Sequence, residues 1–277
     1  MLAKLLRDFP GKEDIISGFT EGFRIGALAN DTSVFGSNSA SVNLNPEEAK
    51  AKIQHELELG RVCGPFDEPP FEVFKSCPLA IRPKPNGKYR LLHNLSYPFN
   101  EDSVNGVIPE SAAKVKYASI SDAIELIKAN PGCWLAKCDI ADAFRIVPIH
   151  PDDYHLLGFS FEGKFYFDRC LPMGCRSACH IFEKVSGALA FILKQHFKID
   201  KVVKYLDDFL FVGADRGSCD RVLRVFQVLC KEVGMPLAPN KTVGPANELV
   251  FLGYKLNTLE MVVEIPKRRL TPIPLNC

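Results

Sequence analysis

The segment KYLDDFLFVG, residues 204–213, places two adjacent aspartates, Asp207 and Asp208, within an otherwise apolar run of strand-forming residues. Burying one ionised carboxylate without a partner is costly, and burying two side by side costs more. The pair therefore belongs to a surface turn or faces something positive. A third carboxylate, Asp139, follows another strand-like segment in CWLAKCDIADAF.

These three carboxylates define a specific chemistry if the end of strand 134–140 lies beside the tip of a hairpin over 202–213. Carboxylates so close repel one another unless a divalent cation neutralises them. Oxygen ligands favour Mg²⁺ or Mn²⁺ over zinc. Two such ions, roughly 3.5 to 4 Å apart, support in-line displacement at phosphorus. We therefore predict Asp139, Asp207 and Asp208 as catalytic metal ligands, with Asp208 the weaker; the alternative is an ordinary Asp-Asp turn.

The elements that must position these residues follow from apolar periodicity. The pattern predicts, in order, strand 134–140, helix 177–197, hairpin 202–213, helix 218–233 and strand 249–256. Further helices are expected over NPEEAKAKIQHELELG and after an N-cap at Ser119 or Ser121. Strands interleaved with long helices indicate an α+β fold, a split βαβ-like antiparallel sheet with its helices on one face.

A second feature is basic. PLAIRPKPNGKYRLLHNL, residues 78–95, reads as two strands joined at Asn86-Gly87, with Arg82, Lys84, Lys88 and Arg90 near the tip and no acidic residue among them. Charge at a hairpin tip can serve solubility alone. The same charge could also grip phosphates.

The composition of the chain limits the possible fold and function. A chain of 277 residues with 47% hydrophobic residues can form one large domain or two small ones, and its net charge of +1 leaves nucleic-acid binding to local patches. No apolar run of 18 residues and no signal-peptide core is present, so we expect a soluble protein of the cytoplasm or nucleus with no membrane partner. The ten cysteines are expected to be reduced thiols. Cys170, Cys175, Cys179 and His180 contain no CxxC pair, which makes zinc a weak reading.

From about Pro78 to Leu256 the chain resembles reverse transcriptases. CDIADAF resembles the first polymerase motif, LPMGCRSACHIF the second, YLDDFLF the third, and FLGYKL the strand that grips the primer. The ordered set carries the resemblance. Within the family, IHPDDYHLLGF, LPMGC and KTVGP resemble the DIRS-like retrotransposons.

The resemblance implies roles for individual residues. Arg90 and Lys84 would clamp the triphosphate, although Arg82, Pro83 and Lys84 cannot be aligned uniquely. The other implied roles are Phe144 as the ring that screens the sugar, Gly174 as a close backbone approach to the template base or nucleotide, Lys241 as general acid, and Phe251, Leu252 and Gly253 as primer grip. Met173 and Cys179 depart from the glutamine and proline of the retroviral second motif, and Asp142 is expected to be structural.

The implied activity is RNA-directed DNA polymerisation. Two Mg²⁺ ions, or Mn²⁺, would assist transfer of a nucleotide from a dNTP to a primer 3'-OH on an RNA or DNA template. Alternatives are a non-catalytic nucleic-acid-binding remnant and an RNA-templated RNA polymerase, against which Phe144 argues. RNase H and recombinase domains of a parent element are possible partners, since little sequence follows residue 266.

The resemblance also divides the chain. We expect a partly helical N-terminal extension over 1–60, the first part of the fingers with the entry to the palm over 61–133, palm over 134–146, the second part of the fingers over 147–176, palm with the primer-grip strand over 177–266, and a truncated tail without a thumb over 267–277.

Overall fold

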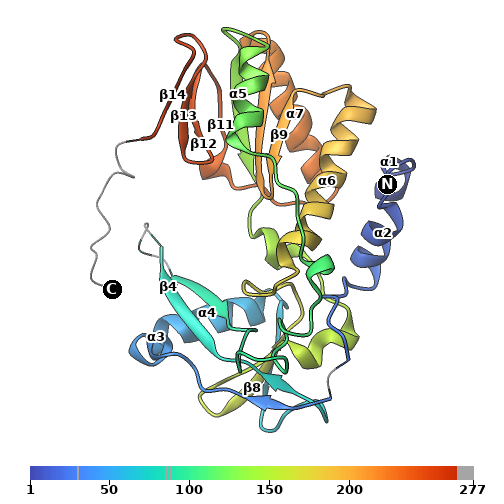
Figure 1. Ribbon diagram of the computed structural model, residues 1–277, viewed down its shortest axis with the longest axis vertical. Helices are drawn as coiled ribbons and strands as arrows, with labels where there is room; N and C mark the ends of the chain where they lie inside the picture. Colours follow the sequence, from blue (N-terminus) through green and yellow to red (C-terminus); the bar gives the residue numbers. More distant parts are fainter. Residues whose placement is uncertain (30, 85–86, 88, 267–277) are drawn as a thin grey trace. The chain divides into compact units, whose positions relative to one another are not determined.

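The computed structural model describes residues 1–29, 31–84, 87 and 89–266, and separates them into two compact units (Figure 1). Unit 1 contains residues 1–9, 116–141 and the chain from 186 onward. Unit 2 contains residues 10–115 and 142–185. Each unit is therefore assembled from separate stretches of the sequence.

Unit 1 is a mixed α/β unit. Its elements are α1 (Leu2–Leu5), α5 (Ile120–Lys128), β6 (Trp134–Asp139), the later part of α6 (Ala178–Phe197), β9 (Val202–Tyr205), β10 (Asp208–Gly213), α7 (Arg216–Glu232), the 3-10 turn η4 (Pro239–Lys241), β11 (Val243–Ala246), β12 (Glu248–Phe251), β13 (Tyr254–Asn257) and β14 (Val262–Glu264).

The central sheet of unit 1 is antiparallel, with strand order β11-β6-β10-β9. The predicted hairpin is confirmed: β9 and β10 are joined by the two residues Leu206 and Asp207. In the β6–β10 ladder Asp208 lies opposite Asp139, and Gly213 lies opposite Trp134. This register brings the two strand ends that carry the carboxylates together.

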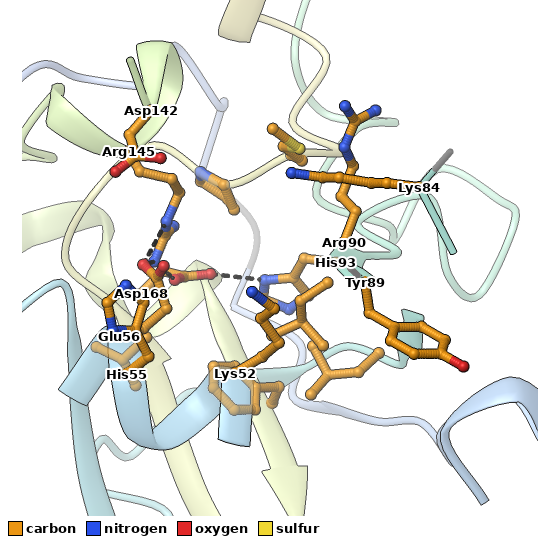
Figure 2. A pocket seen from close by; sticks show the side chains of 16 residues that line it. Lys52, His55, Glu56, Lys84, Tyr89, Arg90, His93, Asp142, Arg145 and Asp168 are labelled. Atoms are coloured by element: carbon orange, nitrogen blue, oxygen red, sulfur yellow. Dashed lines mark hydrogen bonds and ion pairs between the residues drawn. The ribbon is translucent and has the colours of Figure 1, made fainter. Parts of the chain in front are cut away.

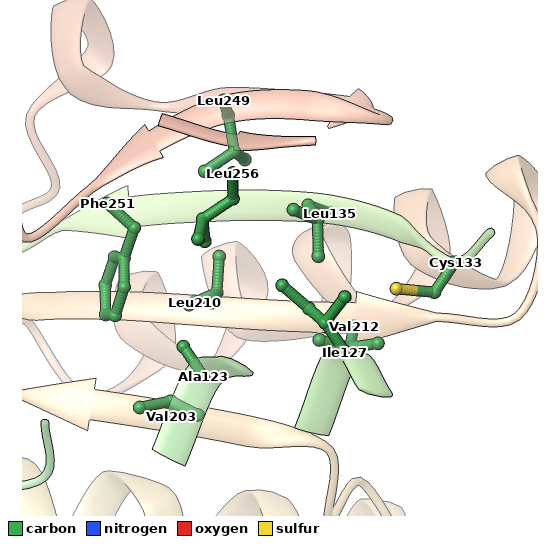
Figure 3. Packing of buried hydrophobic residues seen from close by; sticks show 10 residues of the cluster. All are labelled: Ala123, Ile127, Cys133, Leu135, Val203, Leu210, Val212, Leu249, Phe251 and Leu256. Carbon is green, nitrogen blue, oxygen red and sulfur yellow. The ribbon is translucent and has the colours of Figure 1, made fainter. Parts of the chain in front are cut away.

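Successive side chains of β10 point to opposite faces of the sheet and pack into two separate apolar layers. Phe209 and Phe211 contact Phe226 of α7, with ring centroids 4.6 and 5.0 Å apart. Leu210 and Val212, which point to the opposite face, belong to a cluster completed by α5 and by β12 and β13 (Figure 3). The α+β class is confirmed. The sequence pattern predicts the helices on one face of the sheet, whereas α7 and α5 pack on opposite faces, because alternate residues of β10 are apolar on both sides.

The single strand predicted over 249–256 is wrong. The structure has two antiparallel strands there, β12 and β13, joined at Leu252 and Gly253. Both joining residues have positive φ, 47° and 82°, which is the geometry of a tight hairpin turn. The apolar pattern of the sequence does not reveal this turn. Phe251 and Leu256 are both buried although they lie in different strands, so buried apolar residues continue on both sides of the turn.

Helix boundaries follow the expected chemistry. Ser119, not Ser121, caps α5 through a capping box with Asp122. Asp215 caps α7 in the same way with Ser218. In unit 2, α4 begins at Pro46, and Gly60 beyond its end has φ +67°.

Unit 2 combines short helices with a sheet and a two-stranded ribbon. Its elements are α2 (Lys12–Thr20), β1 (Val34–Phe35), α3 (Ala40–Leu44), α4 (Pro46–Glu58), β2 (Val62–Phe66), β3 (Lys75–Ser76), β4 (Leu79–Pro83), β5 (Tyr89–His93), the 3-10 turns η1 (Glu110–Ala112), η2 (Ala143–Ile146) and η3 (Pro151–Leu156), β7 (Gly158–Phe161), β8 (Lys164–Asp168) and the first residues of α6.

The sheet of unit 2 has the order β1-β3-β7-β8-β2, and β4 pairs with β5 as an antiparallel ribbon. The ribbon is the predicted basic hairpin. The expected turn is Asn86-Gly87, of which Asn86 lies outside the described residues, as does the neighbouring Lys88. Ile53 of α4, Ile81 of β4 and Phe159 of β7 share one buried cluster, so the helix and ribbon rest on the sheet. In the described part of the chain no helix is long and apolar enough to cross a membrane.

The aromatic layer under β10 predicts a stability effect. Phe226→Ala should lower the free energy of unfolding of unit 1 by about 3 to 5 kcal/mol, because it leaves a cavity between Phe209 and Phe211. Trp134, the only tryptophan and a residue of β6, reports the transition in urea. Val228→Ala on the same helix is the control, since Val228 is 59% exposed. Equal losses in the two variants would contradict this packing.

Candidate active site

The carboxylates of unit 1 converge because of strand register. Asp139 ends β6 and is 5% exposed, and Asp208 begins β10 directly opposite it. Directly opposed residues of an antiparallel pair point to the same face, and like charges there are destabilising. Asp207 occupies the adjacent turn, and its carbonyl accepts a hydrogen bond from the Ile140 N–H.

The electrostatics reflect this crowding. Burial, and then the carboxylates of Asp207 and Asp139, raise the pKa of Asp208 to about 6. Lys241 supplies the positive partner: its Nζ lies 2.7 Å from Oδ2 of Asp139. Burial alone lowers the pKa of Lys241, but the hydrogen bond and charge of Asp139 outweigh it and the pKa is raised. One ammonium group thus offsets part of the negative charge of the carboxylates.

The three carboxylates are candidate metal ligands. Their donors are all carboxylate oxygens, which suit Mg²⁺, and Lys241 shows that the place favours a cation. Within the described ranges no three or more His, Cys, Asp or Glu side chains form a group that could hold a metal ion. The donor type and charge of Asp139, Asp207 and Asp208 suit a hard divalent cation, but their side chains do not form a metal-binding group in this structure. The nine described cysteines form no disulfide. Among the described residues nothing supports zinc binding by the cluster around Cys175.

An open groove of about 910 Å³ adjoins Asp208 in unit 1. Its lining includes Tyr117, Tyr205, Lys137 and the predicted primer-grip residues 251–253. Phe251 itself is a core residue with 1% exposure, so the Leu252-Gly253 turn is the more accessible part of that segment. The rings of Tyr117 and Tyr205 lie 5.0 Å apart beside the groove.

A second hollow, of about 160 Å³, lies in unit 2 (Figure 2). Lys84 and Arg90 of the ribbon line it together with Lys52 of α4. Of the alternatives left open by the sequence, Lys84 lines the hollow, whereas Arg82 is not among its lining residues. Arg82 instead lies opposite Arg90 in the β4–β5 ladder.

The other predicted residues of unit 2 have defined surroundings. Phe144 is half-buried and meets Phe182 edge to face, at 5.8 Å between centroids. Gly174 has φ +124°, and a Cβ there would lie 1.9 Å from the carbonyl oxygen of His93. The glycine is required by this backbone contact, while its approach to a nucleotide stays a prediction. Asp142 pairs with Arg61 at 3.0 Å and lines the hollow.

Sequence reasoning missed a buried ion-pair network at the edge of the same hollow. Arg145 contacts both Glu56 and Asp168, and Asp168 also contacts His93. The available signal was the one that identified Asp207: an ionisable residue within an apolar run, as in FYFDRC and DAFRIV. The sequence did not show which of these residues pair.

The sequence was compared with known proteins. A sequence model of the family described as "Reverse transcriptase (RNA-dependent DNA polymerase)" matches residues 82–256, more than half of the chain. The chain belongs to the reverse transcriptase family. This confirms the family resemblance inferred from the motifs.

Reverse transcriptase relatives are mostly large polyproteins. The Gag-Pro-Pol polyprotein of Human T-cell leukemia virus 3 (strain 2026ND) is 27% identical over 77% of this chain and 14% of the polyprotein. The Gag-Pol polyprotein of Walleye dermal sarcoma virus is 28% identical over 66% of this chain and 10% of its own length. The chain therefore spans only a small fraction of these relatives.

Solved reverse transcriptases support the fold. A foamy viral protease-reverse transcriptase in complex with double-stranded DNA superimposes with a TM-score of 0.67 at 21% identity, over 90% of this chain and 40% of that one. A foamy viral complex with an RNA/DNA hybrid gives a TM-score of 0.64 at 20% identity, over 85% of this chain and 29% of that one.

The raised pKa of Asp208 predicts a pH-dependent stability. A carboxyl whose pKa rises from 3.8 to about 6 on folding makes unit 1 progressively less stable as pH increases between those values. Asp208→Asn removes the repelled charge, so without added metal it should raise the Tm at pH 7.5 by more than at pH 5. Thermal unfolding followed by Trp134 fluorescence measures both differences. A Tm gain that is the same at the two pH values would rule out this electrostatic origin.

Proposed function

We propose that the chain is the polymerising part of an RNA-directed DNA polymerase, which transfers a nucleotide from a dNTP to a primer 3'-OH on an RNA or DNA template. The observation that carries the proposal is the opposed pair Asp139 and Asp208 beside Asp207, balanced by Lys241, in a member of the reverse transcriptase family. Reverse transcriptases generally depend on divalent metals, and the donor set suits them.

In this proposal Asp139 and Asp207, with Asp208 as the weaker ligand, hold two Mg²⁺ ions, for which Mn²⁺ can substitute. When bound, such ions lower the pKa of an attacking hydroxyl and stabilise a leaving pyrophosphate. Lys241 is protonated at neutral pH, as lysine ordinarily is. Its Nζ, held 2.7 Å from Oδ2 of Asp139, would give a proton to the leaving group as a general acid.

The residues of unit 2 bind the nucleotide in this proposal. Arg90 offers a two-pronged donor and Lys84 a point charge to the triphosphate. The opposed arginines Arg82 and Arg90 support phosphate binding over a merely solvated tip, because like charges facing each other across a ladder are destabilising without an anion. Phe144 screens the sugar C2' and excludes a ribose hydroxyl, and Gly174 lets the backbone approach the template base or nucleotide closely.

Nucleic-acid partners are proposed on the same basis. The foamy viral relatives were solved with double-stranded DNA and with an RNA/DNA hybrid. The open groove of unit 1, lined by Tyr117, Tyr205 and residues 251–253, is the proposed nucleic-acid surface. IHPDDYHLLGF, LPMGC and KTVGP favour a DIRS-like element as the source. The palm and fingers boundaries given above, and RNase H and recombinase domains as partners, belong to this proposal.

Loss of a metal-ligand charge tests the chemistry. Asp139→Asn and Asp207→Asn should each abolish Mg²⁺-dependent extension of a labelled primer, because the site loses a ligand charge. Asp220→Asn is the control, since Asp220 is a surface residue of α7 paired with Arg224. Extension at the parent rate by Asp207→Asn would sink the proposal, and a parent chain that binds primer-template without extending it would indicate a non-catalytic binding protein.

The sugar gate separates DNA from RNA synthesis. Phe144→Val should lower the ratio of kcat/KM for dCTP to that for CTP by at least about tenfold, equivalent to about 1.4 kcal/mol, because the screening is steric. A purely structural Phe144 would lower both values in proportion. A parent chain that prefers CTP would favour the RNA-polymerase alternative.

A further inference from the structure

The hollow of unit 2 is bordered by four linked ionisable side chains, Glu56, Arg145, Asp168 and His93, here called the relay (Figure 2). Arg145 donates from Nε to Oε2 of Glu56 at 2.9 Å and contacts Oδ1 of Asp168 at 2.7 Å. The other carboxylate oxygen of Asp168 lies 3.0 Å from Nδ1 of His93. The relay runs through four elements, α4, η2, β8 and β5.

The relay is largely removed from water, with side chains between 3% and 17% exposed. Burial lowers the pKa of Arg145, but Asp168 and Glu56 outweigh it and the pKa is raised. Burial raises the pKa of Asp168, but Arg145 and His93 outweigh it and the pKa is lowered. Buried ion pairs contribute little net stability because desolvation offsets their attraction, although they can fix a geometry.

The relay is attached through Arg145 and through His93 to residues of the proposed nucleotide site. Arg145 directly follows Phe144 in η2. His93 ends β5, three residues beyond Arg90, and its backbone N–H donates to the Met173 carbonyl at 3.0 Å. The His93 carbonyl is also the group that excludes any side chain at position 174.

A further bond links the relay to the second motif. Nη1 of Arg145 donates to the Cys170 carbonyl at 3.1 Å, just before Leu171-Pro172-Met173-Gly174. One guanidinium therefore bonds α4, β8 and the strand-to-motif connection at once. A lysine has one charged nitrogen and cannot reproduce this planar set of donors.

We propose that the relay is a positioning device for nucleotide selection: it holds the Phe144 segment, the Arg90 strand and the Met173-Gly174 segment in one geometry. Arg145 and Asp168 are positioning residues, since they act through their neighbours. This inference rests on the proposed polymerase function and adds to it a source of dNTP affinity and sugar selectivity within unit 2.

The test needs a variant that loses a similar buried pair without touching the hollow. Asp153 provides it: it is 2% exposed, lies 2.8 Å from Arg24 and accepts the Ile25 N–H at 2.7 Å, all within unit 2. Asp168→Asn, Arg145→Lys and Asp153→Asn are compared with the parent. The readouts are the Tm, the KM and kcat for dCTP and for CTP in primer extension, and the Tm shift on adding dCTP with Mg²⁺.

We expect all three variants to lose Tm. Only Asp168→Asn and Arg145→Lys should raise the KM for dCTP, by about tenfold or more, lower the dCTP-to-CTP ratio of kcat/KM, and lose most of the dCTP-induced Tm shift. Asp153→Asn should keep the parent's KM, ratio and shift at temperatures below its own transition.

Equal kinetic and binding changes in Asp168→Asn and Asp153→Asn would overturn the inference and leave the polymerase function standing. If Asp168→Asn does not fold, Arg145→Lys decides, and its parent-like KM and ratio would overturn the inference. If the parent shows no extension, the polymerase function fails; the relay is then judged by the dCTP-induced Tm shift alone. A parent with neither extension nor a shift overturns both.

Discussion

The electrostatics of unit 1 depend on two aspartates, Asp139 and Asp208, which face each other across one antiparallel ladder. The register that places Asp208 opposite Asp139 is enforced by the apolar residues that follow on β10, because a shift by one residue would turn Phe209 and Leu210 to the wrong faces. The repulsion at the strand ends is therefore sustained by packing elsewhere in the sheet. The repulsion between the carboxylates leaves the site with uncompensated negative charge, of which Lys241 neutralises part.

Unit 2 contains the electrostatic complement of this arrangement. Its ribbon places Arg82 opposite Arg90, so that positive charge is concentrated by strand pairing as negative charge is in unit 1. A formal net charge of +1 conceals both concentrations.

The three carboxylates could be singled out from the sequence because they interrupt apolar strands, where burying a charge is costly. The long helices and the 202–213 hairpin could be predicted because apolar periodicity is a local signal. The hairpin turn at 252–253 was not predicted, because Leu252 adopts a positive φ, which is uncommon for leucine. The relay was missed because its partners are remote in sequence: 89 residues separate Arg145 from Glu56, and 75 separate His93 from Asp168.

The interleaving of the two units has a consequence for synthesis on the ribosome. All of unit 2 precedes residue 186. The strands β9, β10 and β11, which complete the central sheet of unit 1, and η4, which contains Lys241, come later. Domains tend to fold as the chain emerges, so unit 2 can mature while β6 still lacks its neighbours. Asp139 then spends part of translation without Asp208 and Lys241. Until β10 and β11 are made, both edges of β6 lack their partner strands, and unpaired strand edges favour aggregation.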